Sequence, residues 1–366
     1  MFSILFGVVI LSSFYIGLHG RLYLRALKAP VPALVYWPLF WLISCLYIII
    51  RWGMGTRTES VLSTIGSYWL AAISYFLVLF LFFDLLRLAN RFFKFLPGNL
   101  SGARYTAITG TLVIASVALV LAYGTWRARS PVVTDYTVRV DKPVQGDPLI
   151  VLVADLHLGG LIQKKGLGEM VDMVMAQKPD MVLLAGDILD RWMSVYTDQN
   201  MSEEMRRLKA PLGVFAVPGN HEYFGESVPE FQKLLASDGV RMLIDETVET
   251  GGFTLVGRND RRAGVRKSIL ELIEGLDKTK PLIMMDHQPY NLELAQEAGI
   301  DLQLSGHTHA GQFWPITTVT YFMYEINYGL LRKGGTTIIV TSGYGLWGPP
   351  LRIGSTPEIV RIRFAK

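Results

Sequence analysis

The chain has 366 residues, 51% of them hydrophobic, and a mean hydropathy of +0.32. This composition is too apolar for one ordinary soluble domain, and the length favours two or more domains. The net charge of +4 and the isoelectric point near 9.0 come without a clustered basic recognition helix, so we expect no nucleic-acid partner.

Apolar residues are concentrated before residue 127, in four runs that each approach the ~20 residues a helix needs to span a bilayer. The runs lack the amphipathic stripe of a soluble helix. The first run could be a signal peptide, but it has no basic segment before it and no small-x-small cleavage site. We therefore predict a transmembrane region over residues 1–130 with about four helices, at residues 2–18, 31–50, 66–83 and 106–126.

Lysine and arginine residues near the ends of these runs predict the orientation in the membrane. The loops after the first and third runs contain seven of them: Arg21, Arg25, Lys28, Arg87, Arg91, Lys94 and Arg104. The loop after the second run and the segment after the fourth contain four: Arg51, Arg57, Arg127 and Arg129. Because basic loops stay in the cytoplasm, we expect a multi-pass protein of the cell membrane whose C-terminal half lies outside the cytoplasm.

The only cysteine, Cys45, lies in the second run, which excludes an intrachain disulfide and leaves the compartment undecided. Residues 131–147 connect the two halves, and the alternation over 132–140 predicts a strand there. Leu167, Met170 and Val174 have the spacing of an amphipathic helix over 164–178. Further helices are expected at about 228–238 and 266–276, and further strands at about 252–257, 282–286, 336–341 and 358–364.

Five short polar motifs punctuate the C-terminal half and contain five of the six histidines. They are Asp155-Leu156-His157, Gly186-Asp187-Ile188-Leu189-Asp190, Gly219-Asn220-His221-Glu222, Asp286-His287 and Gly306-His307-Thr308-His309. The first three follow the apolar runs LIVLVA, MVLLA and VFAV, which we interpret as strands. Polar residues at the carboxyl ends of neighbouring strands are typical of the active site of an open α/β sheet. Asp, Asn and His ligands without Cys suit Mn²⁺, Fe or Zn²⁺ in a hydrolytic centre.

With these five motifs, the sequence resembles the calcineurin-like metallophosphoesterases from about residue 148 to residue 366. The resemblance implies an α/β domain over 148–366, with two mixed sheets sandwiched by helices, and two divalent metal ions bridged by a carboxylate. By this resemblance, metal one would be held by Asp155, His157, Asp187 and His309. Metal two would be held by Asp187, Asn220, His287 and His307. His221 would stay off both metals, near the leaving oxygen.

The chemistry of such a site can also be argued from the residue types. Two metals roughly 3.5–4 Å apart clamp the attacking and leaving oxygens of an in-line phosphoryl displacement and make hydroxide available near neutral pH. The two carboxylate oxygens of Asp187 can reach both ions. His221 follows Asn220 and would lie at the metal edge, where a proton donor to the departing alkoxide is useful. Alternatively, His221 only supports Asn220.

We therefore expect a membrane-anchored phosphoesterase that hydrolyses a phosphodiester, pyrophosphate or phosphomonoester bond of a lipid or cell-envelope substrate. The sequence does not select among these bonds, and it leaves the oligomeric state open. A non-catalytic membrane scaffold or sensor on the same fold is the alternative, but the ligand set is complete. Walker, nucleophile-elbow and Rossmann fingerprints are absent, which argues against ATP-dependent phosphorylation and serine hydrolysis.

Two stretches outside the motifs bear on the substrate. Residues 313–324 are unusually apolar and aromatic, and residues 342–352 contribute Trp347 and Arg352. These stretches could form a rim that faces the lipid bilayer and contacts an amphiphilic substrate through Trp314 and Trp347. They could equally be partly buried loops that pack over the sheet. Arg352 could bind a substrate phosphate or be one more surface cation.

The count of basic residues makes the orientation testable. A reporter enzyme fused after Lys366 should be active outside the cytoplasm, and protease added to intact spheroplasts should cleave the C-terminal half. Cleavage only after lysis would reverse the orientation and favour cytoplasmic substrates.

Overall fold

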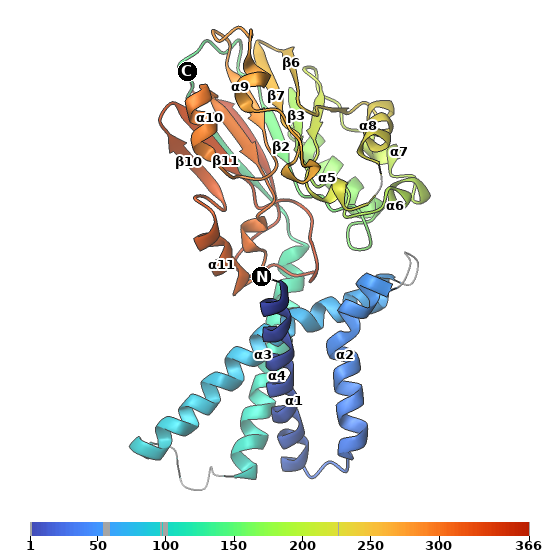
Figure 1. Ribbon diagram of the computed structural model, residues 1–366, viewed down its shortest axis with the longest axis vertical. Coiled ribbons are helices and arrows are strands. Elements are labelled where there is room, and N and C mark those ends of the chain that lie inside the picture. The colour runs from blue at the N-terminus through green and yellow to red at the C-terminus, as the bar shows by residue number, and fades with distance from the viewer. Residues whose placement is uncertain (1, 54–58, 96, 98–101, 226, 366) are drawn as a thin grey trace. The chain divides into compact units, whose positions relative to one another are not determined.

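The computed structural model describes residues 2–53, 59–95, 97, 102–225 and 227–365 (Figure 1). The chain divides into two compact units. The helical unit comprises Met1–Thr125 and Gly348–Pro350, and the α/β unit comprises Trp126–Trp347 and Leu351–Lys366.

The helical unit contains four helices: α1 (Phe2–Ala26), α2 (Ala33–Gly53), α3 (Glu59–Phe93) and α4 (Ala103–Ala128). Among the described residues, three stretches are long and apolar enough to cross a membrane: Gly7–Ala26, Thr64–Phe93 and Ala103–Ala128. In α2 the described apolar stretch is Ala33–Leu46, which is shorter than the ~20 residues of a full span. The described part of the chain therefore supports three of the four expected spans. Arg57, one of the basic residues used to predict orientation, lies outside the described residues.

Polar side chains link the apolar helices of this unit. Tyr15 Oη donates a hydrogen bond to Asp84 Oδ2 at 2.7 Å, and His19 Nε2 lies 3.1 Å from the same oxygen. Trp69 Nε1 donates to Ser44 Oγ at 3.1 Å. Polar groups in apolar helices pair with one another when lipid offers no partner. These pairs fix the contacts of α3 with α1 and α2, and they account for His19, the one histidine outside the polar motifs.

The α/β unit is built on two six-stranded sheets, ordered β1-β12-β2-β3-β4-β5 and β10-β11-β9-β8-β7-β6. The first sheet contains β1 (Val132–Val138), β2 (Ile150–Val153), β3 (Met181–Ala185), β4 (Val214–Val217), β5 (Arg241–Met242) and β12 (Glu358–Phe364). The second contains β6 (Glu246–Thr250), β7 (Phe253–Gly257), β8 (Leu282–Met285), β9 (Leu302–Ser305), β10 (Gly329–Lys333) and β11 (Thr336–Val340). Strand β12 is antiparallel to β2, β10 to β11, and β6 to β7, whereas the other pairs are parallel. The expected pair of mixed sheets is confirmed.

Alternating residues of the central strands form separate cores. Ile150 and Leu152 of β2 pack in the cluster between the sheets, with Leu255 of β7. Val151 and Val153 pack in the cluster formed with the helices of the first sheet. Because successive side chains point to opposite faces of a strand, a central strand covered on both faces is apolar throughout. This explains why LIVLVA and MVLLA carry no polar residue.

Helices cover the outer faces of both sheets, and α8 and α10 lie on opposite sides of the pair (Figure 1). Helices α5 (Lys164–Met175) and α8 (Val228–Ser237) pack on the first sheet, and α9 (Ile269–Ile273) and α10 (Leu292–Ala298) pack on the second. The remaining helices are α6 (Met193–Asp198), α7 (Ser202–Met205) and α11 (Ile316–Met323). Short 3-10 turns occur at η1 (His221–Tyr223), η2 (Arg261–Ala263) and η3 (His309–Gly311).

The strand ends position the polar motifs. Asp155, Asp187 and Asn220 come directly after the parallel strands β2, β3 and β4. His287 and His307 come directly after β8 and β9, which are parallel neighbours in the second sheet. The carboxyl ends of parallel neighbours meet at one edge. The two sheets therefore bring all five motifs to one place.

Candidate metal centre

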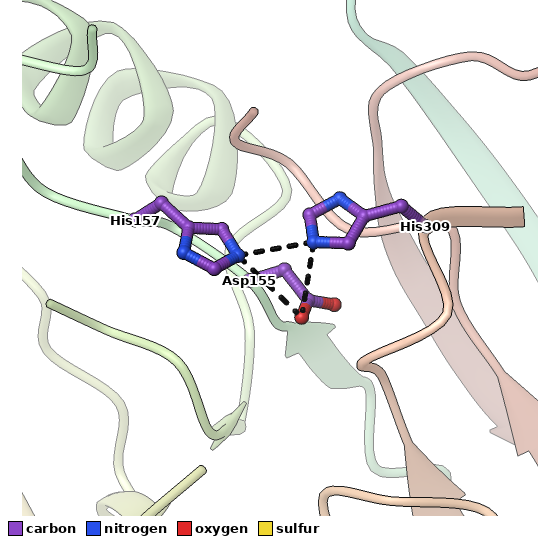
Figure 2. Close-up of side chains that lie close together, drawn as sticks. All are labelled: Asp155, His157 and His309. Atoms are coloured by element: carbon purple, nitrogen blue, oxygen red, sulfur yellow. Dashed lines mark hydrogen bonds and ion pairs between the residues drawn. The ribbon is translucent and has the colours of Figure 1, made fainter. Parts of the chain in front are cut away.

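The first cluster of candidate ligands joins the motif after β2 to the motif after β9. Figure 2 shows Asp155, His157 and His309 pointing toward one another. His157 Nε2 lies 3.0 Å from His309 Nε2, and Asp155 Oδ1 lies 3.5 Å from His309 Nε2. All three side chains are buried. Two imidazole nitrogens and a carboxylate oxygen at this separation form a compact set of donors for a cation.

The second cluster is centred on Asp187. Its Oδ2 lies 3.1 Å from His287 Nε2 and 3.8 Å from His157 Nε2, and donor atoms of Asp187, His287 and His307 lie within 4.8 Å of one another. Donor atoms of Asp187, His157 and His221 also lie within 4.8 Å of one another. Asp187 is thus near the donors of both clusters, where a shared ligand would have to lie.

Two features of these side chains fit a bound metal. The buried Oδ1 of Asn220 has no hydrogen-bond partner among the described residues, although an unpaired buried acceptor is unfavourable. His287 Nδ1 lies 2.8 Å from the carbonyl oxygen of Ala185, so Nδ1 donates there and Nε2 faces Asp187 Oδ2 at 3.1 Å. Fixing one ring nitrogen in this way prepares the other for a metal. The donor set of His, Asp and Asn is that of Mn²⁺, Fe or Zn²⁺.

Burial and neighbouring charges shift the pKa values of the clustered carboxylates and imidazoles. Burial would raise the pKa of Asp187, but the neighbouring His287 and His221 hold it well below its usual range. Burial raises the pKa of Asp155. Burial and the charge of His287 lower the pKa of His307 to about 3, and burial with the charge of His157 lowers the pKa of His309. His307 and His309 are therefore neutral imidazoles, the form that binds metal.

The backbone at the clusters is unusual. Five candidate ligands have positive φ: Asp155 (55°), His157 (47°), Asp187 (50°), His307 (71°) and His309 (50°). Residues with a Cβ rarely adopt this region, and such strained positions collect at functional sites. The left-handed residues after β2, β3 and β9 redirect the chain there so that these ligands point to a common centre.

Close packing around the candidate ligands explains two of the motif glycines. A Cβ on Gly186 would lie 2.6 Å from Nδ1 of His287, and a Cβ on Gly219 would lie 2.1 Å from Oδ1 of Asp187. No real Cβ approaches that closely, so each position excludes a side chain. The glycine before Asp187 and the one before Asn220 let the backbones of neighbouring motifs touch the ligands.

His221 lies at the edge of the clusters and is oriented by its neighbours. Its Nδ1 lies 2.6 Å from the carbonyl oxygen of Asp190, so Nδ1 donates, and its backbone N–H donates to Asp187 Oδ1 at 2.8 Å. Burial lowers the pKa of His221, but the charges of Asp187 and Asp190 outweigh burial and raise it to about 9. The imidazole is therefore protonated at neutral pH.

A cavity of about 210 Å³ opens over the clusters. Its walls contain His157, Asp187, Asn220, His221, His307, Thr308, His309, Gly311, Ile316, Thr320, Tyr324 and Trp347. The polar part of the wall comes from the motifs, and the apolar part comes from α11 and Trp347. The cavity thus presents the candidate metal ligands to a molecule from solution or from another surface.

The sequence has clear relatives. Residues 148–311 match the family described as calcineurin-like phosphoesterase. A Danio rerio protein named "Transmembrane protein with metallophosphoesterase domain" is 30% identical over 323 residues, which cover 81% of this chain and 74% of that protein. An "Uncharacterized metallophosphoesterase" of Aquifex aeolicus is 33% identical over 240 residues, which cover 62% of this chain and 89% of that protein. The chain belongs to the calcineurin-like metallophosphoesterase family.

A similar protein from Helicobacter pylori strain J99, also named "Uncharacterized metallophosphoesterase", is 36% identical over 234 residues. These residues cover 62% of this chain and 61% of the relative, so the match spans about three fifths of the relative's length.

The two clusters of candidate ligands together contain six of the seven expected metal ligands: Asp155, His157, Asp187, His287, His307 and His309. The seventh, Asn220, lines the cavity with its unpaired oxygen. Of the residues expected to contact substrate, Trp347 lines the cavity, whereas Trp314 is 40% exposed and is not part of the cavity wall.

The structure corrects the role of Arg352. Its side chain is 0% exposed, so it is neither a surface cation nor open to a substrate phosphate. Its guanidinium donates to the carbonyl oxygens of His309 (3.0 Å), Ser342 (2.8 Å) and Gly345 (2.7 Å). Arg352 therefore positions the His309 turn by satisfying backbone carbonyls that would otherwise be buried without partners. No pattern around position 352 in the sequence signals this role.

Glu222 has a role that the sequence analysis left unassigned. Its buried carboxylate accepts hydrogen bonds from the backbone N–H groups of Asp187 (3.1 Å), Gly219 (2.7 Å) and Leu189 (2.9 Å). Burial and the charge of Asp187 raise the pKa of Glu222 to about 7. The carboxylate joins the turn after β3 to the turn after β4, which explains an acidic residue directly after Asn220 and His221.

Replacement of Asp187 tests the centre directly. Asp187→Asn retains the shape of the side chain but removes the charge shared by the clusters, so purified protein should lose at least one equivalent of bound metal by mass spectrometry. The exposed Asp198→Asn serves as the matched control and should leave the metal content unchanged. Full metal content and turnover in Asp187→Asn would rule out a shared carboxylate at this position.

Arg352→Met removes several buried hydrogen bonds at about 1 kcal/mol each, so we expect a loss of about 3 kcal/mol in the free energy of unfolding. The midpoint of thermal unfolding, measured in detergent, should fall by several degrees. The same substitution at the exposed Arg332 should have little effect. An unchanged midpoint for Arg352→Met would contradict the positioning role.

Proposed function

We propose that the chain is a membrane-anchored, metal-dependent phosphoesterase. The observation that carries the proposal is the pair of buried Asp/His clusters that meet at Asp187 beneath one cavity. Membership of the metallophosphoesterase family and the three apolar helices support the two halves of this description. The bond hydrolysed would be a phosphodiester, pyrophosphate or phosphomonoester.

Two divalent ions, Mn²⁺, Fe or Zn²⁺, would be held by the residues named from the sequence. Asp155, His157 and His309 would hold one, Asn220, His287 and His307 would hold the other, and Asp187 would contribute to both. When bound, such ions polarise the phosphoryl oxygens and supply hydroxide near neutral pH. The chain itself keeps His307 and His309 neutral and Asp187 charged, through burial and neighbouring charges.

His221 would donate a proton to the departing oxygen. Its Nδ1–H is committed to the carbonyl of Asp190, which leaves Nε2 to exchange a proton with a molecule in the cavity that His221 lines. A raised pKa of about 9 supports a group that is protonated before the reaction. A proton donor matters most for a leaving alkoxide, whose conjugate acid is weak.

The substrate would be a lipid or a cell-envelope component, acted on outside the cytoplasm. Two observations support an amphiphilic substrate: the chain carries apolar helices that can cross a membrane, and the wall of the cavity includes Ile316 and Trp347 next to the metal ligands. A polar head group would occupy the ligand side of the cavity, and an apolar portion would lie against α11.

Turnover of a chromogenic phosphodiester tests the proposal. The full chain in detergent should hydrolyse bis(4-nitrophenyl) phosphate with Mn²⁺, lose activity with a chelator, and recover activity when Mn²⁺ is returned. Asp198→Asn should behave as the wild type. Absence of any metal-dependent turnover of phosphodiesters, phosphomonoesters and pyrophosphates would favour a non-catalytic membrane scaffold or sensor.

His221→Ala extends the same assay to the proton donor. We expect the variant to retain its metals and to lose about 10²-fold or more in turnover of an alkyl phosphodiester. The loss for the nitrophenyl substrate should be smaller, because nitrophenolate leaves without a proton. Equal losses on both substrates would indicate that His221 only supports Asn220.

A further inference from the structure

We propose that α11 lies in the membrane–water interface, with its outer face against lipid and its inner face in the wall of the metal cavity. The partner is the bilayer that holds the chain's own apolar helices. The idea that a lipid substrate enters along α11 rests on the proposed function. The contact of α11 with lipid is independent of that function.

The outer face of α11 is apolar and open. Val319, Tyr321, Phe322 and Met323 are exposed, Phe322 to 80% and Tyr321 to 68%. No residue from Phe313 to Tyr324 is charged. Exposed aromatic and apolar side chains of this density are unfavourable in water, and aromatic rings are enriched where a membrane meets water. Phe313, in contrast, is buried within the α/β unit.

The inner face of the same helix belongs to the metal cavity. Ile316, Thr320 and Tyr324 recur every four residues, and all three line the cavity with the candidate metal ligands. Ile316 and Thr320 share one face of the helix, and Tyr324 follows as its C-cap. A single helical layer therefore separates the candidate metal centre from the exposed apolar face.

Hydrogen bonds connect α11 to the point where α4 enters the α/β unit. The last turn of α4, from Trp126 to Ala128, belongs to this unit, and Arg127 Nη2 donates to Thr356 Oγ1 at 2.8 Å. Ile353 lies three residues before Thr356, and its carbonyl oxygen accepts a hydrogen bond from the backbone N–H of Trp314 at 2.9 Å. Trp314 directly precedes Pro315, the N-cap of α11. Four consecutive residues span at most about 14 Å. Since α4 is apolar and long enough to cross a membrane, this loop joins the start of α11 to the last turn of a candidate membrane helix.

These observations favour lipid over a protein partner on this face. A partner protein would need its own complementary apolar surface, whereas α1, α3 and α4 already contain stretches that can cross a membrane. The exposed face also combines aromatic rings, which suit the interface, with aliphatic side chains, which suit the acyl region.

Spin labelling of the full chain tests the contact without turnover. On a Cys45→Ser background, a nitroxide at Phe322→Cys is compared in phosphatidylglycerol/phosphatidylethanolamine nanodiscs with one at Leu270→Cys. Leu270 is an exposed apolar residue of α9 outside the cavity wall, at 65% exposure. Collisions with oxygen, which concentrates in lipid, and with a water-soluble nickel chelate report the environment of each label.

The label at 322 should show a several-fold higher ratio of oxygen to nickel collisions than the label at 270. Equal ratios would place α11 in water and overturn the inference. Low collision rates with both reagents, or dipolar broadening between labels, would show that protein or a second copy covers the face, and would also overturn it. None of these readouts depends on hydrolysis, so the phosphoesterase proposal can fail while the lipid contact stands.

The substrate path has a separate readout. Tyr321→Ser with Phe322→Ser should raise KM several-fold for a phosphodiester with long acyl chains relative to KM for a short-chain, water-soluble phosphodiester. Leu270→Ser, as the matched control, should leave this ratio unchanged. An unchanged ratio in the double variant would show that α11 does not guide the substrate, whatever the outcome of the spin-label measurement.

Discussion

The burial of the Asp187 carboxylate among imidazole rings is the interaction on which the α/β unit depends. An isolated buried carboxylate is strongly unfavourable, and it is tolerated only when opposite charges and hydrogen-bond donors surround it. His287 and His221 provide the charge, and the backbone N–H of His221 provides a donor. His287 follows β8 of the second sheet and His221 follows β4 of the first, so the carboxylate is stable only when both sheets are assembled.

The backbone at the candidate ligands adopts unfavourable conformations. The left-handed turns at the ligands are each unfavourable by about 1–3 kcal/mol, and they persist because buried polar side chains hold the turns from behind. Glu222 binds the backbone N–H groups of two turns, and Arg352 binds the carbonyl groups of another. Stability and function are therefore closely linked here, since the groups that fix the ligands also hold the ends of the strands.

Much of this arrangement could be predicted from the sequence, because buried parallel strands and polar strand ends leave a local signature. LIVLVA, MVLLA and VFAV proved to be β2, β3 and β4, and the helix expected over 164–178 is α5. The roles of Arg352 and Glu222 could not be predicted, since they depend on which distant carbonyl and N–H groups the fold brings to them. α11 could not be distinguished from a strand or loop, because residues 313–324 contain no charged residue to mark a polar helix face. The run expected at residues 31–50 coincides with α2 (Ala33–Gly53), of which the described apolar stretch is Ala33–Leu46.

The pairing of β1 with β12 has a consequence for biosynthesis. β1 begins four residues after α4 ends, yet its partner along the whole of its length is β12, which also separates β1 from β2. The first sheet thus cannot close until residues 358–364 have left the ribosome, by which time the apolar helices have long been available for insertion. Contacts between such distant segments form slowly, and unpaired strand edges are prone to aggregate meanwhile. A chain that stops short of β12 would leave two edges open, one of them tethered directly behind a membrane helix.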